Sequence, residues 1–307
     1  MKIAIIGTGG AGGYFGAKLA QHGFDVGFLA RGAQLNALQK TGLSVKSTLG
    51  DFQLEQVRAS DKISELGKSD LIILGVKSWQ IKEIREDLKS IIHADTMILP
   101  LQNGVLAIEE LSEVIDPKHI LGGLCKIISK IEAPGLIHHI GVIPQIIFGE
   151  PNKTISPRLQ ALKAVFDKAE IESHISADIE ADLWKKFILI CVGGLLALSK
   201  TSYGELRSLP ETRPLMIELL EEILNLSKAI GIQIEVDYMD KTLSFIDTFP
   251  YDSASSLARD IWAGYPSEIE YQNGTVVRLG EAYGVATPIN RFVYDCILPM
   301  ERKAREV

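Results

Sequence analysis

The sequence predicts an α/β protein: a Rossmann-type, doubly wound parallel sheet followed by a smaller all-α C-terminal domain. Two observations carry this prediction. Up to residue 176, short apolar runs alternate with segments of helical period, as in parallel βαβ units. After Asp178 the strand-like runs cease, and the remaining segments are helical in period. We therefore expect two domains, at residues 1–176 and 177–307.

The first predicted domain begins with KIAIIG, a continuous apolar run typical of a strand buried on both faces. A glycine-rich turn follows and opens a helix that ends at Gly23, a residue suited to a helix C-terminus. FDVGFLAR, SDLIILGVK and DTMILPLQNG predict three more strands, with the amphipathic helix QIKEIREDLKSI between the last two. The domain is completed by β-rich sequence around residues 137–148, a helix over 157–169 and the short strand IESHIS.

The second predicted domain contains three long helical segments. These are DLWKKFILICVGGLLALS, RPLMIELLEEILNLSKAIG and SEIEYQNGTVVRLGEAYG. In the second segment, leucines and isoleucines fall on one face and Gly231 follows as a stop signal. Such apolar helices pack within one chain or bury against a partner subunit, so a monomer and a homodimer are both open.

The composition excludes several classes of protein. A net charge of −7 argues against a nucleic-acid-binding protein, because no broad positive face is available. The three cysteines are far apart, which fits reduced thiols and offers neither a disulfide frame nor a metal site. The longest apolar run, residues 187–199, is shorter than the roughly 20 residues that cross a bilayer. Since the N-terminal run also lacks the features of a secretory signal, we expect a cytoplasmic protein without a membrane segment.

The turn after the first strand predicts a dinucleotide site. Gly7, Gly9 and Gly12 form the pattern GxGxxG between a strand and a helix. The first glycine permits a tight turn, the second lets the backbone approach a pyrophosphate, and the third lets helix and strand pack closely. A purely structural turn is the alternative, but the flanking strand and helix favour a cofactor held at the helix N-terminus. The candidate cofactor-binding residues of this turn are Gly7, Thr8, Gly9, Gly10, Ala11 and Gly12.

The end of the second strand favours NADP over NAD. NAD-binding sites place Asp or Glu about 20 residues after the glycine motif, where the carboxylate bonds the ribose hydroxyls. Here FLARGAQ places Arg31 at that position, with no carboxylate beside it. An arginine can bind the 2′-phosphate of NADP in a forked, charge-assisted pair. The alternative is an ordinary solvated surface arginine.

Polar side chains follow two further strands, where ligands bind in open α/β folds. LGVKSWQ places Lys77 after one strand, and LPLQNG places Gln102 and Asn103 after the next. Asn103 before Gly104 could simply form a turn, because both residue types favour turns. Lys77 could simply be an exposed residue at the start of a helix. Both residues are therefore candidates with an open alternative.

A proton donor from the second domain cannot be histidine, because all six histidines precede residue 175. Lysine, tyrosine or a carboxyl with a raised pKa would have to serve. Lysine suits ketone reduction, since its ammonium donates a proton to the developing alkoxide and stabilises the charge. Lys185 and Lys186 begin the apolar run LWKKFILICVGG and lie about 100° apart around a helix, so one can face a ligand. The alternative is that both snorkel to solvent.

Together these elements resemble the ketopantoate reductase (2-dehydropantoate 2-reductase) family over nearly the whole chain. The resemblance rests on IGTGGAGGYFG, Arg31, VKSWQ, LQNG, LWKKFILICV, YGEL, SSLARD and SEIEYQNG, in this order and spacing. It implies a Rossmann domain joined to an all-helical domain, with the site between them. It also implies NADPH-dependent reduction of a small 2-keto acid, ketopantoate, to pantoate, as in pantothenate biosynthesis.

The resemblance assigns roles to individual residues. Lys186 lies in the family's W-x-K context and is the expected proton donor and substrate contact. Asn103 and Lys77 would line the nicotinamide and ribose side of the site, and Glu268 would lie near the nicotinamide ribose. The stretch SEIE offers an alternative for Glu268, because serine followed three residues later by glutamate is a helix capping box.

The substrate side departs from the family. Ser256 would contact the substrate, although it could simply start a helix, and Ser253 stands where asparagine is familiar. Ile190 and Gly194 occupy the i+4 and i+8 positions from Lys186, where the family commonly has asparagines. Ketopantoate would then leave hydrogen bonds unmade. The alternatives are a reductase of a less polar 2-keto acid, a different hydroxyacid dehydrogenase, and a non-catalytic NADPH-binding sensor.

Overall fold

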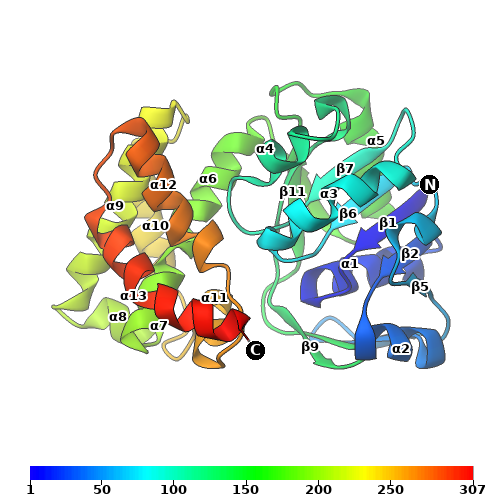
Figure 1. Ribbon diagram of the computed structural model, residues 1–307, viewed down its shortest axis with the longest axis horizontal. Coiled ribbons are helices and arrows are strands. Elements are labelled where there is room, and N and C mark those ends of the chain that lie inside the picture. The colour runs from blue at the N-terminus through cyan, green and yellow to red at the C-terminus, as the bar shows by residue number, and fades with distance from the viewer. Residues whose placement is uncertain (307) are drawn as a thin grey trace. The chain divides into compact units, whose positions relative to one another are not determined.

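The chain forms two compact units in a computed structural model that describes residues 1–306 (Figure 1). The first unit comprises Met1–Gln102 and Leu106–Ile179, and the second comprises Asn103–Val105 and the chain from Glu180 onward. The second unit thus begins at Glu180, against residue 177 in the sequence-based prediction. It also takes in Asn103–Val105, which follow β7 (Met97–Pro100) of the first unit after two intervening residues.

The first unit is built on a five-stranded parallel sheet in the order β5-β2-β1-β6-β7. Its strands are β1 (Lys2–Ile6), β2 (Asp25–Leu29), β5 (Arg58–Ser60), β6 (Leu71–Leu74) and β7 (Met97–Pro100). The helices of this unit are α1 (Gly10–Gln21), α2 (Gly32–Thr41), α3 (Ile81–Leu88), α4 (Ala107–Ser112) and α5 (Pro157–Lys168). The predicted doubly wound parallel sheet is confirmed.

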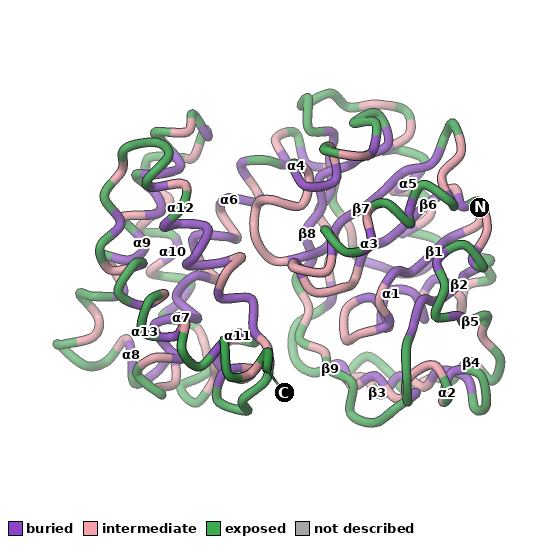
Figure 2. The backbone as a smooth tube through the Cα atoms, viewed as in Figure 1, coloured by how far each residue is buried: buried purple, intermediate pink, exposed green. Residues whose placement is uncertain are grey.

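The side chains of β1 show why the sheet is covered on both faces. Ile3 and Ile5 belong to one buried apolar cluster, whereas Ala4 and Ile6 belong to another. Successive side chains of a strand point to opposite faces, so each cluster fills one face of the sheet. Figure 2 shows the central strands as buried along their length.

Two smaller sheets complete the first unit. One has the order β4-β3-β10-β9, and the other has the order β12-β11-β8. Their strands are β3 (Leu43–Ser47), β4 (Phe52–Leu54), β8 (Gly122–Lys126), β9 (Ser129–Ala133), β10 (Leu136–His139), β11 (Gln145–Gly149) and β12 (Glu172–Ile175). The β-rich sequence around 137–148 is therefore two strands in different sheets, whereas β12 lies within the predicted IESHIS.

The described part of the second unit is helical and contains no strand. Its helices are α6 (Ile179–Ile190), α7 (Val192–Ser199), α8 (Tyr203–Ser208), α9 (Thr212–Ile230), α10 (Tyr238–Asp247), α11 (Ser256–Trp262), α12 (Asn273–Tyr283) and α13 (Pro288–Arg305). One apolar cluster forms its core, and Val105 packs against it. The predicted all-α C-terminal domain is confirmed as a fold.

Two of the three predicted long helices are interrupted. The first is divided at Cys191 into α6 and α7, and Gly194 N–H donates to the Cys191 carbonyl three residues earlier. The third begins as a 3₁₀ turn over Ile269–Tyr271 and is broken at Gln272, whose φ and ψ of −111° and −103° are not helical. The apolar periodicity of the sequence continues across both breaks. It reflects which side chains are buried and does not show where the backbone hydrogen bonds of a helix are interrupted.

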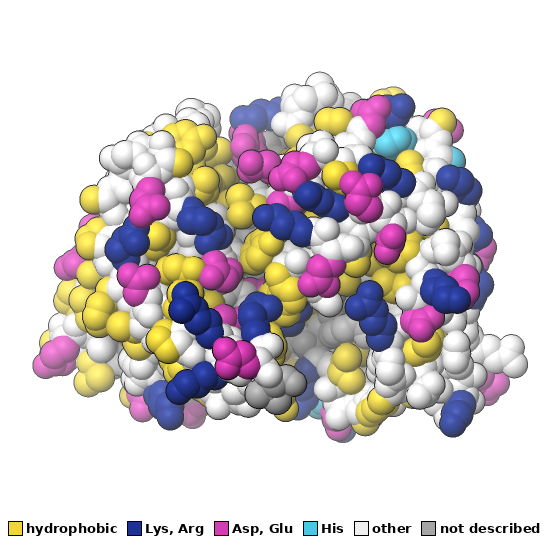
Figure 3. Space-filling model, viewed as in Figure 1, with side chains coloured by type: hydrophobic (Ala, Val, Ile, Leu, Met, Phe, Trp, Pro, Cys, Tyr) yellow, Lys and Arg dark blue, Asp and Glu magenta, His cyan; other side chains and the backbone are white. Residues whose placement is uncertain are grey.

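Charges of both signs are interspersed over the surface face shown in Figure 3. Within residues 1–306, no helix has the length and apolarity to cross a membrane. The same residues hold no group of three or more His, Cys, Asp or Glu side chains arranged for a metal ion.

Candidate active site

The three motif glycines at the end of β1 have three different environments. Gly7 has φ of +100°, and a Cβ atom added there would lie 2.6 Å from the Val76 nitrogen. A Cβ added at Gly9 would meet a single atom, the Gly75 carbonyl oxygen at 3.8 Å. One added at Gly12 would lie 2.2 Å from the Gly7 carbonyl oxygen. The turn is thus tight at Gly7, open at Gly9 and closely packed at Gly12, which fits a pyrophosphate beside Gly9.

The remaining residues of this turn are partly used for structure. The Thr8 hydroxyl is buried and donates to the Leu29 carbonyl at 2.9 Å, which joins the turn to the end of β2. A Cβ at Gly10 would lie 2.5 Å from the Ser129 carbonyl oxygen. Ala11 is half-buried and packs on the core. We therefore expect Thr8 and Ala11 to offer backbone atoms to an anion rather than side chains.

Sequence reasoning missed one further glycine. Gly75 follows β6, and a Cβ there would lie 2.8 Å from both the Gly12 Cα and the Gly7 carbonyl oxygen. The turn after β1 therefore packs backbone against backbone with the end of β6. A glycine directly after a buried strand was the available signal.

Arg31 lies after β2, immediately before α2, and is exposed. The first turn of α2 contains no acidic residue. Among residues 1–306, no ion pair or side-chain hydrogen bond of Arg31 is present. An exposed guanidinium beside a helix N-terminus is a suitable partner for a phosphate group.

The residues after β6 and β7 lie in the first unit up to Gln102. Lys77 is half-buried and precedes a 3₁₀ turn over Ser78–Gln80, so the helix-start alternative describes its backbone correctly. Its ammonium lies 6.0 Å from the ring centroid of Trp79. The Gln102 amide donates to the Leu74 and Val76 carbonyls at 2.9 and 3.1 Å, which joins the ends of the two strands.

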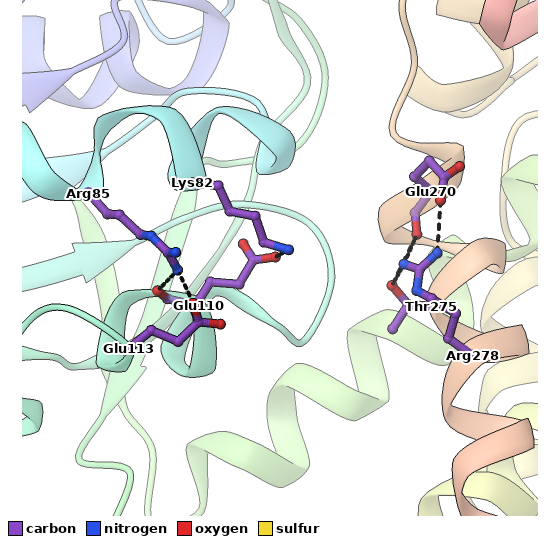
Figure 4. Close-up of polar contacts among 7 residues, drawn as sticks. All are labelled: Lys82, Arg85, Glu110, Glu113, Glu270, Thr275 and Arg278. Atoms are coloured by element: carbon purple, nitrogen blue, oxygen red, sulfur yellow. Dashed lines mark hydrogen bonds and ion pairs between the residues drawn. The ribbon is translucent and has the colours of Figure 1, made fainter.

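Figure 4 shows the ion pairs that join α3 to α4 in the first unit. Lys82 pairs with Glu110 at 3.2 Å, and Arg85 bonds both Glu113 and the Glu110 carbonyl. These contacts fix the helix that follows the Lys77 turn.

Asn103 and Glu268 meet within the second unit although 165 residues separate them. The Asn103 amide donates to Glu268 Oε2 at 3.4 Å. Glu268 is 7% exposed, whereas Asn103 is half-buried. Gly104 has φ of +105°, so turn chemistry operates at this position together with the side-chain contact. The pair unites an amide and a carboxylate that the sequence could not place together.

The capping-box alternative for Glu268 is wrong. The Ser267 N–H, which Glu270 would accept in a capping box, donates to Glu301 at 3.0 Å, and the Ser267 hydroxyl accepts from the Ile269 N–H rather than from that of Glu270. Glu270 instead pairs with Arg278 at 2.8 Å, as Figure 4 shows, and accepts a hydrogen bond from Tyr294. Burial, with the bond to Glu270, raises the pKa of Tyr294 to about 12.

The two candidate serines differ in the hydrogen bonds that their hydroxyls make. Ser253 is half-buried, and its hydroxyl donates to the Pro250 carbonyl at 2.6 Å. Ser256 is exposed and is the first residue of α11, so it does start a helix. The cap of that helix is Ser255, whose hydroxyl accepts from the Ala258 N–H at 3.0 Å. The Ser256 hydroxyl is thus not needed for capping.

The two lysines of α6 are not equivalent. Lys185 forms an ion pair with Glu235 at 2.9 Å, and this hydrogen bond lowers the pKa of Glu235 below its ordinary value. The Tyr238 hydroxyl donates to the Lys185 carbonyl at 2.6 Å, which fixes the same turn of α6. Lys186 is half-buried and lies about 100° further around the helix. Lys185 therefore takes part in a contact with the residues before α10.

Ile190 and Gly194 do not present one common face. Ile190 ends α6 and is half-buried, whereas Gly194 is buried in α7. A Cβ at Gly194 would lie 2.3 Å from Asn273 Oδ1 and 2.8 Å from Val293 Cγ1. Position 194 therefore faces α12 and α13 in the core of the second unit.

Comparison with known protein families assigns both units. Residues 3–153 match the family described as "Ketopantoate reductase PanE/ApbA", and residues 178–301 match "Ketopantoate reductase PanE/ApbA C terminal". The chain belongs to the ketopantoate reductase family. Family membership makes the chain a nicotinamide-dependent oxidoreductase that acts on a small molecule. The resemblance deduced from the sequence motifs is confirmed.

Individual relatives agree with the family over nearly the full length. A protein of Bacillus subtilis (strain 168) named "Uncharacterized oxidoreductase YkpB" is 31% identical over 96% of this chain and 97% of its own. A "2-dehydropantoate 2-reductase" of Nostoc sp. is 32% identical over 94% of this chain and 91% of its own. A crystal structure of 2-dehydropantoate 2-reductase from Geobacter metallireducens GS-15 has a TM-score of 0.91 and 30% identity, covering 97% of this chain and 99% of that one.

Proposed function

We propose that the protein reduces a 2-keto acid with NADPH, with ketopantoate, converted to pantoate, as the first substrate to test. The contact between Asn103 and Glu268 carries this proposal, because it brings an amide and a carboxylate together from distant segments. A pure binding protein has little need for this pair together with Lys186. The name of the Nostoc relative supports ketopantoate, whereas that of the Bacillus relative leaves the substrate open.

The residues of the first unit fit a dinucleotide. The space beside Gly9 and the N–H groups at the start of α1 suit a pyrophosphate. Arg31 and the acid-free start of α2 suit a 2′-phosphate better than a ribose hydroxyl pair. We assign the cofactor contacts of this unit to Gly7, Thr8, Gly9, Gly10, Ala11, Gly12, Arg31 and Lys77. Asn103 and Glu268 would hold the nicotinamide ribose.

NADPH, when bound, supplies the hydride that reaches the carbonyl carbon of the substrate. In the proposed mechanism, the Lys186 ammonium donates a proton to the carbonyl oxygen as negative charge develops there. The same positive charge stabilises the oxyanion before the proton is transferred. Ser256 and Ser253 would bind the carboxylate or hydroxyl groups of the substrate, and Asn103 would orient the reacting groups.

Three other functions are candidates. Ile190 presents an apolar side chain where the family commonly has an amide, which favours a less polar 2-keto acid. A non-catalytic NADPH sensor would keep the glycine turn and Arg31 but would not require Lys186. A different hydroxyacid dehydrogenase on the same plan would differ from the first proposal in its substrate alone.

A panel of 2-keto acids tests the proposed function. We expect at least one acid of the panel to support NADPH oxidation, which is measured by the loss of NADPH absorbance. The two most informative substrates are ketopantoate and an apolar branched 2-keto acid. Turnover of the apolar acid alone would select the second candidate. Intact NADPH binding with no turnover on any member of the panel would refute the reductase and favour the sensor.

Arg31→Asp tests the cofactor assignment. Loss of a charge-assisted phosphate contact, with a new carboxylate beside the phosphate, should weaken NADPH binding by about 10- to 100-fold. NADH binding should improve or stay constant, because the carboxylate can bond ribose hydroxyls. Fluorescence titration with both cofactors measures the change, and unchanged NADPH affinity would exclude the role of Arg31.

A further inference from the structure

The peptide that precedes Glu268 is held by the last helix of the chain. Glu301 on α13 accepts hydrogen bonds from the Ser267 N–H at 3.0 Å and the Ser267 hydroxyl at 2.5 Å. Arg305, one turn later, donates to the Ser267 carbonyl at 3.2 Å. The N–H, carbonyl and side chain of Ser267 are therefore all bound by two residues of α13, which we call the α13 clamp.

The clamp contains a buried carboxylate. Ser267 is fully buried and the Glu301 side chain is 4% exposed, so its charge is largely removed from water. Arg305 compensates that charge through its Nε, 2.6 Å from Glu301 Oε1. Removing one partner of such a pair leaves an uncompensated buried charge, which is costly. A buried carboxylate and its arginine partner that bind the N–H and the carbonyl of one residue fix the two peptide units on either side of that residue.

Glu268 is consequently fixed on both sides. Its N-terminal neighbour lies in the α13 clamp, and its own carbonyl accepts from the N–H groups of Tyr271 and Gln272 at 3.0 and 2.9 Å. A Cβ added at Gly104 would lie 3.0 Å from the Tyr271 carbonyl oxygen, so the Asn103–Gly104 turn packs against the same 3₁₀ turn. With its backbone held in this way, the Glu268 carboxylate meets the Asn103 amide.

We propose that Glu301 and Arg305 are positioning residues that act on the cofactor through Glu268. The inference rests on the proposed function, in which Glu268 and Asn103 hold the nicotinamide ribose. It adds that NADPH affinity depends on α13, whose clamp residues lie 33 and 37 positions beyond Glu268 in the chain (301 − 268 and 305 − 268).

A double-mutant cycle tests the clamp. Glu301→Gln keeps the volume but removes the charge, and we expect it to raise the NADPH dissociation constant by about tenfold. In a Glu268→Ala background, the same substitution should cause no further loss, because the residue through which it acts is absent. Arg302→Gln, the exposed neighbour on α13, is the matched control and should leave the affinity unchanged. Fluorescence titration gives the affinities and thermal unfolding gives the melting temperature.

The outcomes separate this inference from the proposed function. Absence of NADPH binding by the unmodified protein overturns both. Normal binding with additive losses, or a lower melting temperature with unchanged NADPH affinity after Glu301→Gln, overturns only the clamp. If Glu301→Gln fails to fold, Arg305→Gln replaces it, since this variant keeps both Ser267–Glu301 bonds. It should weaken NADPH binding about threefold, and again only when Glu268 is present.

Discussion

Lys186→Ala should lower kcat for 2-keto acid reduction by about 10²- to 10⁴-fold while NADPH affinity stays within about twofold. A lysine that donates the proton acts on the oxyanion formed during the reaction, so its loss affects the transition state rather than cofactor binding. Steady-state kinetics on the best acid of the panel, with a separate NADPH titration, measure the two quantities. A large loss of NADPH affinity with unchanged kcat would contradict the role of Lys186 as proton donor.

The neighbouring lysine provides the control for this experiment. Lys185→Ala removes the ion pair with Glu235, which is partly exposed, so we expect a stability loss below about 1 kcal/mol. Its kcat should stay within about threefold of the unmodified enzyme. Equal losses of kcat in both variants would show that the positive charge of this part of α6, and not one particular lysine, supports the reaction. Lys185 is bound to Glu235 at 2.9 Å, so its loss should affect chiefly the packing of α6 against that residue.

The fold could be predicted largely because buried strands and amphipathic helices have distinct apolar periods. β1 and β6 are buried on both faces and read as unbroken apolar runs. By contrast, β4 is three residues long and half-buried, and neither its length nor its pattern separates it from a loop. The break at Cys191 escaped prediction because residues on both sides are apolar and fit one helical period.

In the candidate site, contacts between residues close in the sequence could be predicted, and contacts between distant residues could not. The glycine turn could be predicted because the spacing of its glycines reflects local backbone geometry. Gly12 packs against Gly7 in the same turn, and Gly7 and Gly9 lie beside the residues that follow the neighbouring strand β6. The Asn103–Glu268 contact could not, since it depends on how a turn after β7 meets a turn before α12. The capping-box interpretation failed for the same reason. Glu301, which is 34 residues from Ser267, accepts the Ser267 N–H that a capping box would give to the side chain of Glu270.

Gly194→Asn, which introduces the residue type that the family resemblance implies at this position, should destabilise the second unit by about 1–3 kcal/mol. The first atom of any side chain would lie 2.3 Å from Asn273 Oδ1 and 2.8 Å from Val293 Cγ1. Asn273 is not free to move, because its amide donates to the Cys191 carbonyl at 3.1 Å and to Asn290 at 3.0 Å. Denaturant unfolding of the purified variant measures the loss, and Gly194→Ala should show a smaller loss of the same sign.

The matched variant is Ile190→Asn, which restores the other family amide at a half-buried position at the end of α6. If position 190 lies beside the substrate, the new amide should raise kcat/KM for ketopantoate relative to an apolar 2-keto acid by up to about tenfold. Gly194→Asn should not change that ratio, because residue 194 faces the core of its own unit. A stable Gly194→Asn variant with improved selectivity for ketopantoate would show instead that α7 shifts to admit the amide. Substrate choice would then be set by the packing between Gly194 and Asn273, and not by the residue at position 190.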